Sequence, residues 1–180
     1  SPLVNGRRIA QQIEHACLGF LQQLDEAEAS ADPKAQVRSW SRRLLLGWLA
    51  KEEVTIDLPE IPKGSVPDIS VVVVLYNQAG LTRKTLQALA DQRGVAFETI
   101  IVDNASSDET PSLLTRVRGA RVISNEANRG FLLAANQAAA LAEGRHLVFL
   151  NSDAILQRGA LKAACARLDA EPSIGAVGGR

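Results

Sequence analysis

The sequence predicts an α/β fold, with an open, mostly parallel sheet flanked by helices and a helical region before it. Three observations support this. Continuous β-branched runs, such as residues 69–75, are typical of strands that are buried on both faces. These runs alternate with helical segments, as in β-α-β units with right-handed crossovers. Residues 1–58 instead show only helical periodicity.

The helical region, residues 1–58, contains two predicted helices. Apolar residues recur every three or four positions within residues 9–24, which gives one apolar face. Asp32 before Pro33 suits a helix cap and a first helical position. The stripe expected on the second helix consists of Val37, Trp40, Leu44, Leu45, Trp48 and Leu49. Residues 59–67, with three prolines, are predicted to be a linker.

Two interpretations of residues 35–50 stay open. Tryptophans and arginines on an amphipathic helix are found at membrane surfaces. Packing against a neighbouring helix or another domain is favoured, because the polar face is short and the helical region 1–58 also contains acidic residues.

Residues 68–180 are predicted to form the sheet and its helices. We expect strands over residues 69–75, 97–102, 121–124, 146–150 and 174–177. Helices are expected over residues 81–90, 110–117, 130–142 and 159–168. The pair Thr110-Pro111 suits the start of the second of these helices.

Composition limits which binding partners and which cellular compartment are expected. The 20 basic and 20 acidic side chains cancel, so a nucleic-acid partner is not expected. Cys17 and Cys165 have no metal-type spacing, which favours a reducing, cytoplasmic setting. Cys165 and His146 are predicted to be structural. The Ser-Pro start, the lack of methionine and the end at Gly-Gly-Arg indicate a piece of a longer protein.

Polar clusters follow three of the predicted strands. They are Leu75-Tyr76-Asn77, residues 103–108 and Asn151-Ser152-Asp153. Each alone suits a cap or a turn. However, Asp103 and Asp153 follow buried strands, where a carboxylate without a partner is poorly solvated. Ligands of open parallel sheets bind beyond the carboxyl ends of the strands, so we expect one shared site.

The residue types at these strand ends favour a nucleotide and a metal ion. The sequence contains no G-x-G-x-x-G, P-loop or G-x-S-x-G motif. Mg²⁺ and Mn²⁺ prefer oxygen ligands and are often shared with substrate phosphates. A second carboxylate can accept a hydrogen bond from a base or a ribose. A nucleoside diphosphate bridged by a metal ion fits both acids.

Four segments together carry a family resemblance: VVVVLYNQAGLTRKTLQAL, ETIIVDNASSDET, SNEANRGFLLAANQAAALAEG and HLVFLNSDA. Residues 69–179 resemble the N-terminal half of a glycosyltransferase family 2 domain, of the Rossmann-like GT-A fold. The resemblance is to the rhamnosyltransferase-like branch. Residues 1–58 have no part in it.

The resemblance implies a donor site for a UDP- or dTDP-sugar. Asn151-Ser152-Asp153 matches the metal motif Asp-x-Asp, so Asp153 is expected to contact Mg²⁺ or Mn²⁺. The amide of Asn151 implies weaker cation binding than a pair of aspartates. The donor-binding residues that the resemblance implies are Leu75, Tyr76, Asn77, Asp103, Asn128, Gly130, Asn151 and Ser152, with Asn136 matching a recurrent family asparagine.

The activity implied is an inverting transfer of a hexosyl group to a glycan or lipid-linked hydroxyl acceptor, in polysaccharide biosynthesis. The catalytic base and acceptor pocket are expected beyond residue 180, so residues 1–180 are predicted to bind a donor without transferring sugar. A silent interaction module, with residues 1–58 as its docking surface, is the alternative. A nucleotidyltransferase is disfavoured, because residues 77–80 are poor in glycine and cations.

Overall fold

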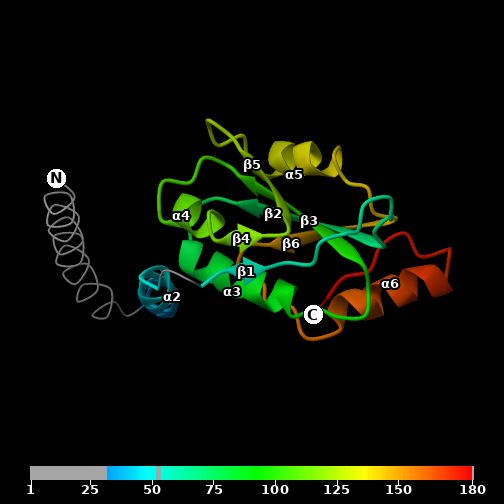
Figure 1. Cartoon of the computed structure of the whole chain (residues 1–180), viewed down its shortest axis with the longest axis horizontal. Helices are drawn as coiled ribbons and strands as arrows, with labels where there is room; N and C mark the ends of the chain where they lie inside the picture. Colours follow the sequence, from blue (N-terminus) through cyan, green and yellow to red (C-terminus); the bar gives the residue numbers. More distant parts are fainter. Residues whose placement is uncertain (1–31, 52–53, 180) are drawn as a thin grey trace, which may run out of the picture.

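The computed structural model describes residues 32–51 and 54–179. The described residues contain a four-stranded sheet in the order β5-β3-β2-β6, in which every neighbouring pair is parallel (Figure 1). This confirms the predicted fold class. The strands are β2 (Ile69–Leu75), β3 (Phe97–Asp103), β5 (Ala120–Ser124) and β6 (His146–Asn151).

Helices cover both faces of this sheet (Figure 1). The helices α3 (Ala79–Ala90), α4 (Thr110–Leu114) and α6 (Ala160–Ala170) pack on one face, and α5 (Phe131–Ala139) packs on the other. Successive residues of β2 alternate between these two cores. Val71 and Val73 join the α3 side, whereas Val72 joins the α5 side. Burial on both faces explains why residues 69–75 read as a continuous apolar run.

The register of the strands sets the position of the polar clusters. Leu75, the last residue of β2, is opposite Asp103 of β3. On the other side of β2, Val74 is opposite Asn151 of β6. Because all three strands are parallel, their polar ends lie at the same edge of the sheet. We call this edge, formed by the ends of β3, β2 and β6, the rim.

One short strand pair was not predicted. The strands β1 (Ile56–Asp57) and β4 (Val117–Arg118) pair in parallel beside the main sheet. The prediction of a helix through residue 117 was therefore wrong, because α4 ends at Leu114 and the chain then enters β4. Gly119 follows with a φ of 72°, and a Cβ at this position would overlap the backbone of Leu58.

The predicted strand over residues 174–177 is also wrong. The structure describes these residues, and none of them pairs with a strand. Val177 is 39% exposed, so this segment lies outside the cores that its apolar character suggested. An apolar run of this length predicts burial but does not supply a pairing partner.

The helix α2 (Pro33–Leu49) starts as predicted, with the Asp32 side chain accepting a hydrogen bond from the backbone of Lys34. Its predicted stripe is divided between two faces. Leu45 and Trp48 are buried against the α3 side, whereas Val37, Trp40 and Leu44 are 51%, 60% and 56% exposed. The Arg42 guanidinium binds the Glu109 carboxylate, with Nε 3.0 Å from Oε1.

No helix in residues 32–51 and 54–179 has the length and apolar character needed to cross a membrane. The helix predicted within residues 9–24 lies outside the described residues.

Candidate functional site

The rim brings three of the predicted polar clusters to adjacent strand ends. Adjacent strands are about 4.8 Å apart, so Asp103 and Asn151, which flank β2, are separated by roughly 10 Å at the backbone. This span lets one extended ligand contact both strand ends. Asp153 follows two residues after Asn151, in a turn closed by the Ala154 backbone N–H donating to the Asn151 carbonyl over 3.1 Å.

Asp103 is a buried carboxylate, with 5% of the residue exposed. Its Oδ1 accepts a hydrogen bond from the backbone N–H of Ser106 over 3.0 Å. Ala105 lies between them with a φ of 65°, in the left-handed region that alanine rarely adopts. This conformation costs about 1–3 kcal/mol, so the surrounding hydrogen bonds hold the loop in a strained shape. Strain of this kind is common in binding loops.

Asn104 joins this loop to the segment before α5. Its side-chain Nδ2 donates to Asn128 Oδ1 over 2.7 Å, and its Oδ1 accepts from the Arg129 backbone N–H over 3.1 Å. Asn125 Nδ2 donates to the same Oδ1 over 3.0 Å. Asn104 is only 2% exposed, so these bonds compensate its desolvation. The sequence predicts no separate role for Asn104, although an amide so close to the end of a predicted buried strand is a signal that the sequence contains.

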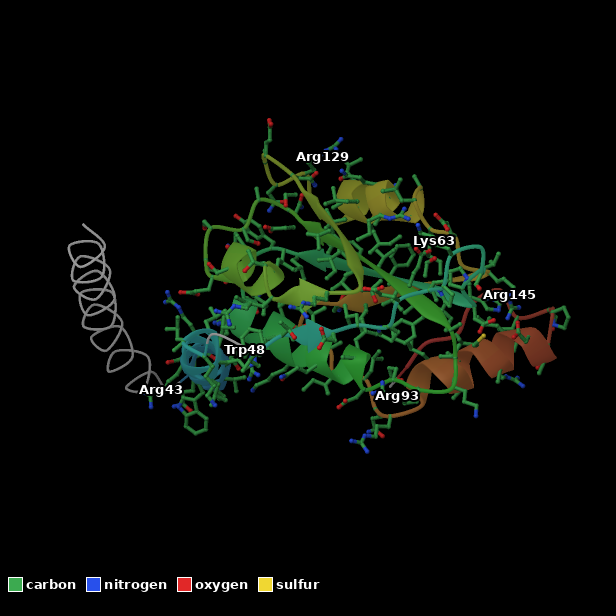
Figure 2. All side chains as sticks on the ribbon, in the orientation of Figure 1. Arg43, Trp48, Lys63, Arg93, Arg129 and Arg145 are labelled. Atoms are coloured by element: carbon green, nitrogen blue, oxygen red, sulfur yellow. The ribbon has the colours of Figure 1, made fainter. Side chains whose placement is uncertain are left out.

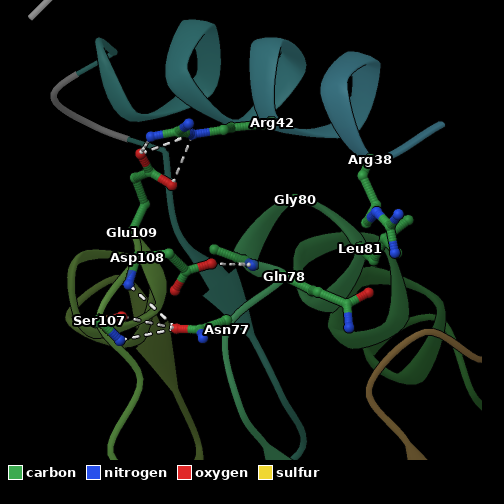
Figure 3. Close-up of a pocket in the computed structure, with 10 residues that line it drawn as sticks. Arg38, Arg42, Asn77, Gln78, Gly80, Leu81, Ser107, Asp108 and Glu109 are labelled. Carbon is green, nitrogen blue, oxygen red and sulfur yellow. Dashed lines mark hydrogen bonds and ion pairs between the residues drawn. The ribbon is translucent and has the colours of Figure 1, made fainter. Parts of the chain in front are cut away.

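The turn between β2 and α3 is held by a second set of hydrogen bonds (Figure 3). Asn77 and Gln78 both have positive φ values, of 59° and 62°. The Asn77 Oδ1 accepts from the backbone N–H groups of Ser107 and Asp108, over 2.8 and 3.3 Å. In return, Asp108 Oδ2 accepts from the backbone N–H of Ala79 over 2.9 Å. The side chain of Asn77 thus links the loops that follow β2 and β3.

Leu75 and Tyr76, the other two residues predicted to bind the donor at the end of β2, differ in their exposure to solvent. The side chain of Leu75 is fully buried, so only its backbone can face a ligand, and its carbonyl already accepts from the Asn104 N–H. Tyr76 is 50% exposed and leaves an aromatic surface beside the rim.

The residues before α5 that are predicted to bind the donor lie next to the hydrogen bonds made by the Asn104 side chain. Asn128 Oδ1 accepts from the Gly130 backbone N–H over 2.9 Å, and Gly130 precedes the first residue of α5 with a φ of 77°. Asn136 is exposed on α5. In Figure 2, Arg129 extends from this part of the molecule, near α5.

Asn151, Ser152 and Asp153 end the third strand. The Ser152 carbonyl accepts from the Thr85 hydroxyl over 2.9 Å, which ties this turn to α3. Asn151 and Asp153 are exposed. Their oxygen donors fit a hard divalent cation, and one carboxylate with an amide leaves positions for phosphate oxygens and water.

An open cleft of about 500 Å³ lies beside the rim (Figure 3). It is bounded by α2, by the turn between β2 and α3, and by the loop after β3. Neither Asp103 nor Asp153 lines it. We therefore identify the candidate site by the strand ends and not by this cleft. The lining residues are Arg38, Arg42, Asn77, Gln78, Ala79, Gly80, Leu81, Ser107, Asp108 and Glu109.

The chain is similar to known proteins. The family model described as glycosyl transferase family 2 matches residues 70–180. The succinoglycan biosynthesis protein ExoO of Rhizobium meliloti is 35% identical over 114 residues, which are 62% of this chain and 32% of ExoO. The UDP-Glc:α-D-GlcNAc-diphosphoundecaprenol β-1,3-glucosyltransferase WfaP of Escherichia coli is 30% identical over 87 residues, covering 47% of this chain and 35% of WfaP. The chain thus spans about a third of the length of these relatives.

A solved structure supports the same relationship. The mannosyltransferase PcManGT from Pyrobaculum calidifontis, in complex with GDP-Man and Mn²⁺, aligns with a TM-score of 0.56 and 25% identity. The alignment covers 88% of this chain and 44% of PcManGT.

Proposed function

Because the chain belongs to glycosyl transferase family 2, we propose that its rim binds a nucleoside-diphosphate sugar, either a UDP- or a dTDP-sugar. The whole enzyme would transfer the hexosyl group, with inversion, to a hydroxyl of a glycan or lipid-linked acceptor in polysaccharide biosynthesis. The observation that carries the proposal is the position of Asp103 and Asn151-Ser152-Asp153 at the carboxyl ends of β3 and β6, the two strands that flank the end of β2.

Within this proposal, the nucleoside lies at the end of β2, between Tyr76 and Asp103. A half-exposed aromatic ring offers a stacking surface, and a buried carboxylate offers a strong acceptor for a base or ribose donor. The Asn77 and Asn104 networks hold both loops in place before the ligand arrives. Such preorganisation lowers the ordering cost of binding.

The diphosphate extends toward β6, where Asp153 would hold Mg²⁺ or Mn²⁺, with Asn151 and Ser152 as neighbouring oxygen donors. A bound divalent cation offsets the charge on the diphosphate. PcManGT, whose structure contains GDP-Man and Mn²⁺, supports this assignment by analogy.

Calorimetric titration tests the proposal. We expect residues 1–180 to bind UDP- or dTDP-sugars more tightly with Mn²⁺ than with chelator. A silent interaction module predicts no metal-linked nucleotide affinity, so equal and negligible heats would favour that alternative. In the same samples we expect no sugar transfer to added acceptors, since the base is predicted outside residues 1–180; measurable transfer would contradict that prediction.

Replacing Asp153 with alanine should remove most of the metal's contribution and leave metal-free nucleotide binding unchanged. The carboxylate is the one charged oxygen donor in Asn151-Ser152-Asp153. Because Asp153 is exposed, the free energy of unfolding should change by no more than about 0.5 kcal/mol. Asp91→Ala is the matched control, since Asp91 is an exposed acid at the other end of α3. Retention of the full Mn²⁺ effect in Asp153→Ala would exclude Asp153 as a ligand.

We also propose that α2 contacts the cytoplasmic surface of a membrane. The exposed Val37, Trp40 and Leu44 share one side of a helix whose segment, residues 33–51, contains no acid. WfaP acts on a diphosphoundecaprenol, which is a lipid, so an enzyme of this type needs access to a membrane. The exposed cations around this face are Lys34, Arg38, Arg43 and Lys51.

Trp40→Ala combined with Leu44→Ala should lower partitioning onto anionic vesicles by at least about tenfold, because fully burying even one apolar side chain contributes about 1.5–3 kcal/mol and about 1.4 kcal/mol corresponds to tenfold. Co-sedimentation with vesicles that contain phosphatidylglycerol measures this. Phe131→Ala, which removes a similarly exposed ring from α5, should have no effect. Equal partitioning of the parent, the double variant and Phe131→Ala would contradict membrane contact through α2.

A further inference from the structure

A cluster of metal-ligating side chains lies at the opposite edge of the sheet from the rim. His146 is the first residue of β6, and Cys165 and Asp169 are one turn apart on α6. The His146 Nε2 is 2.8 Å from Asp169 Oδ1, and the Cys165 thiol donates to Asp169 Oδ2 over 3.5 Å. The three ligating atoms all lie within 4.8 Å of one another.

One guanidinium and two carboxylates lie at the cluster. Arg145 binds both oxygens of Asp169, over 3.0 and 3.3 Å, and its Nη2 also lies 2.8 Å from Asp68 Oδ1. Asp68 therefore continues to balance Arg145 if Asp169 binds a metal. Figure 2 places Arg145 at the α6 end of the molecule, opposite Arg43 and Trp48 of α2. The cluster is thus remote from the proposed donor site.

A reactive cysteine does not explain these contacts. Burial, followed by the hydrogen bond to Asp169, raises the pKa of the Cys165 thiol, which keeps it protonated and unreactive. The contacts with Arg145 and His146 hold the pKa of Asp169 well below its usual range, so this carboxylate is charged. Arg145, His146 and Cys165 thus all contact one charged carboxylate.

We propose that His146, Cys165 and Asp169 bind Zn²⁺ or a similar borderline-soft cation. Imidazole nitrogen, thiolate sulfur and carboxylate oxygen are the three ligand types that zinc combines in proteins. On binding, the Cys165 Sγ–H proton is released to solvent and the sulfur–metal bond forms. The imidazole carries its remaining proton on Nδ1, and Nε2 donates its lone pair. Water occupies the fourth position, and Arg145 remains a hydrogen-bonding partner of Asp169.

The ion would attach α6 to the sheet. Among the described residues of α6, only Leu161 and Cys165 are buried, so this helix has a small apolar contact with the rest of the protein. A metal bridge from Cys165 and Asp169 to the start of β6 adds a link that the unfolded chain lacks. Binding should therefore raise the thermal unfolding temperature.

The test uses the full chain, with Co²⁺ as a spectroscopic probe and Zn²⁺ as a competitor. We expect one equivalent of Co²⁺ to give an ultraviolet thiolate-to-metal charge-transfer band, and Zn²⁺ to abolish the band. Cys165→Ser should remove the band. His146→Gln and Asp169→Asn should each weaken Zn²⁺ binding by about 100-fold or more, since removing even outer-shell partners costs ~10–100-fold.

The chain contains one other histidine and one other cysteine, His15 and Cys17. The double variant His15→Gln, Cys17→Ser should retain both the band and the zinc-dependent rise in unfolding temperature. Loss of the band in this variant, or its persistence in Cys165→Ser, would overturn the proposal. His146→Gln leaves the Arg145–Asp169 contact intact, so it remains informative if Asp169→Asn fails to fold. Nucleotide binding by Cys165→Ser should be unchanged, which separates this site from the donor site.

Discussion

Replacing Asp103 with alanine is expected to weaken binding of a UDP- or dTDP-sugar by about 10- to 100-fold. A hydrogen bond to a charged group contributes about 1.5–3 kcal/mol, and each 1.4 kcal/mol corresponds to about a tenfold change in affinity. Asp103 is buried at the end of β3, and its Oδ1 is occupied by the Ser106 N–H. In our proposal its Oδ2 accepts from the ligand. Isothermal titration with the preferred donor and Mn²⁺ measures the loss.

Asp103→Asn separates the two roles of this side chain, which are to accept a hydrogen bond from Ser106 and to offer a charged acceptor to the ligand. Its amide oxygen can still accept from Ser106, so the loop should keep its shape, while the charge is lost. We expect Asp103→Asn to unfold like the parent and still bind the donor at least about tenfold more weakly. Asp91→Ala again serves as the exposed-acid control. If folded Asp103→Asn and Asp103→Ala both bind like the parent, Asp103 does not contact the nucleotide.

The difference between Asp103 and its neighbour Asn104 shows what the sequence could predict about the site. A carboxylate directly after a buried strand is unusual, so Asp103 is noticeable in the sequence alone. Asn104 instead depends on partners more than 20 residues away, such as Asn125 and Asn128. No local pattern specifies these contacts. Residue type and position predicted the strand ends, while the hydrogen bonds that shape the loops required the tertiary structure.

The same distinction applies to the fold. The central strands β2 and β3 follow from long β-branched runs, whose burial on both faces leaves a clear pattern, whereas β5 and β6 are partly exposed. The strands β1 and β4 have two residues each and pair across about 60 residues of sequence, so neither periodicity nor length could indicate them. On α2, periodicity predicted an apolar stripe but could not tell which part of it meets α3. Leu45 and Trp48 are buried there, while Trp40 is exposed.

The packing of α2 on α3 gives the second large effect, because Gly80 lies directly against the backbone of α2. A Cβ on Gly80 would be 2.5 Å from the Ser41 carbonyl oxygen and 2.6 Å from the Arg42 nitrogen. These are backbone atoms of α2, which cannot move without shifting the helix. Gly80→Ala is therefore expected to lower the free energy of unfolding by about 1–3 kcal/mol. The usual gain of up to about 1 kcal/mol from alanine within a helix would be outweighed.

Gly47→Ala is the matched control, since Gly47 lies on α2 and a Cβ at this position would meet open space. This variant should be stabilised by up to about 1 kcal/mol, so the two substitutions should have opposite signs in urea unfolding. Trp48, buried against α3, reports on the same contact once Trp40 is replaced by phenylalanine. In that background Gly80→Ala should shift Trp48 emission to longer wavelength, and Gly47→Ala should not. Equal stabilisation by both alanines would mean that α2 does not pack closely against α3 at Gly80.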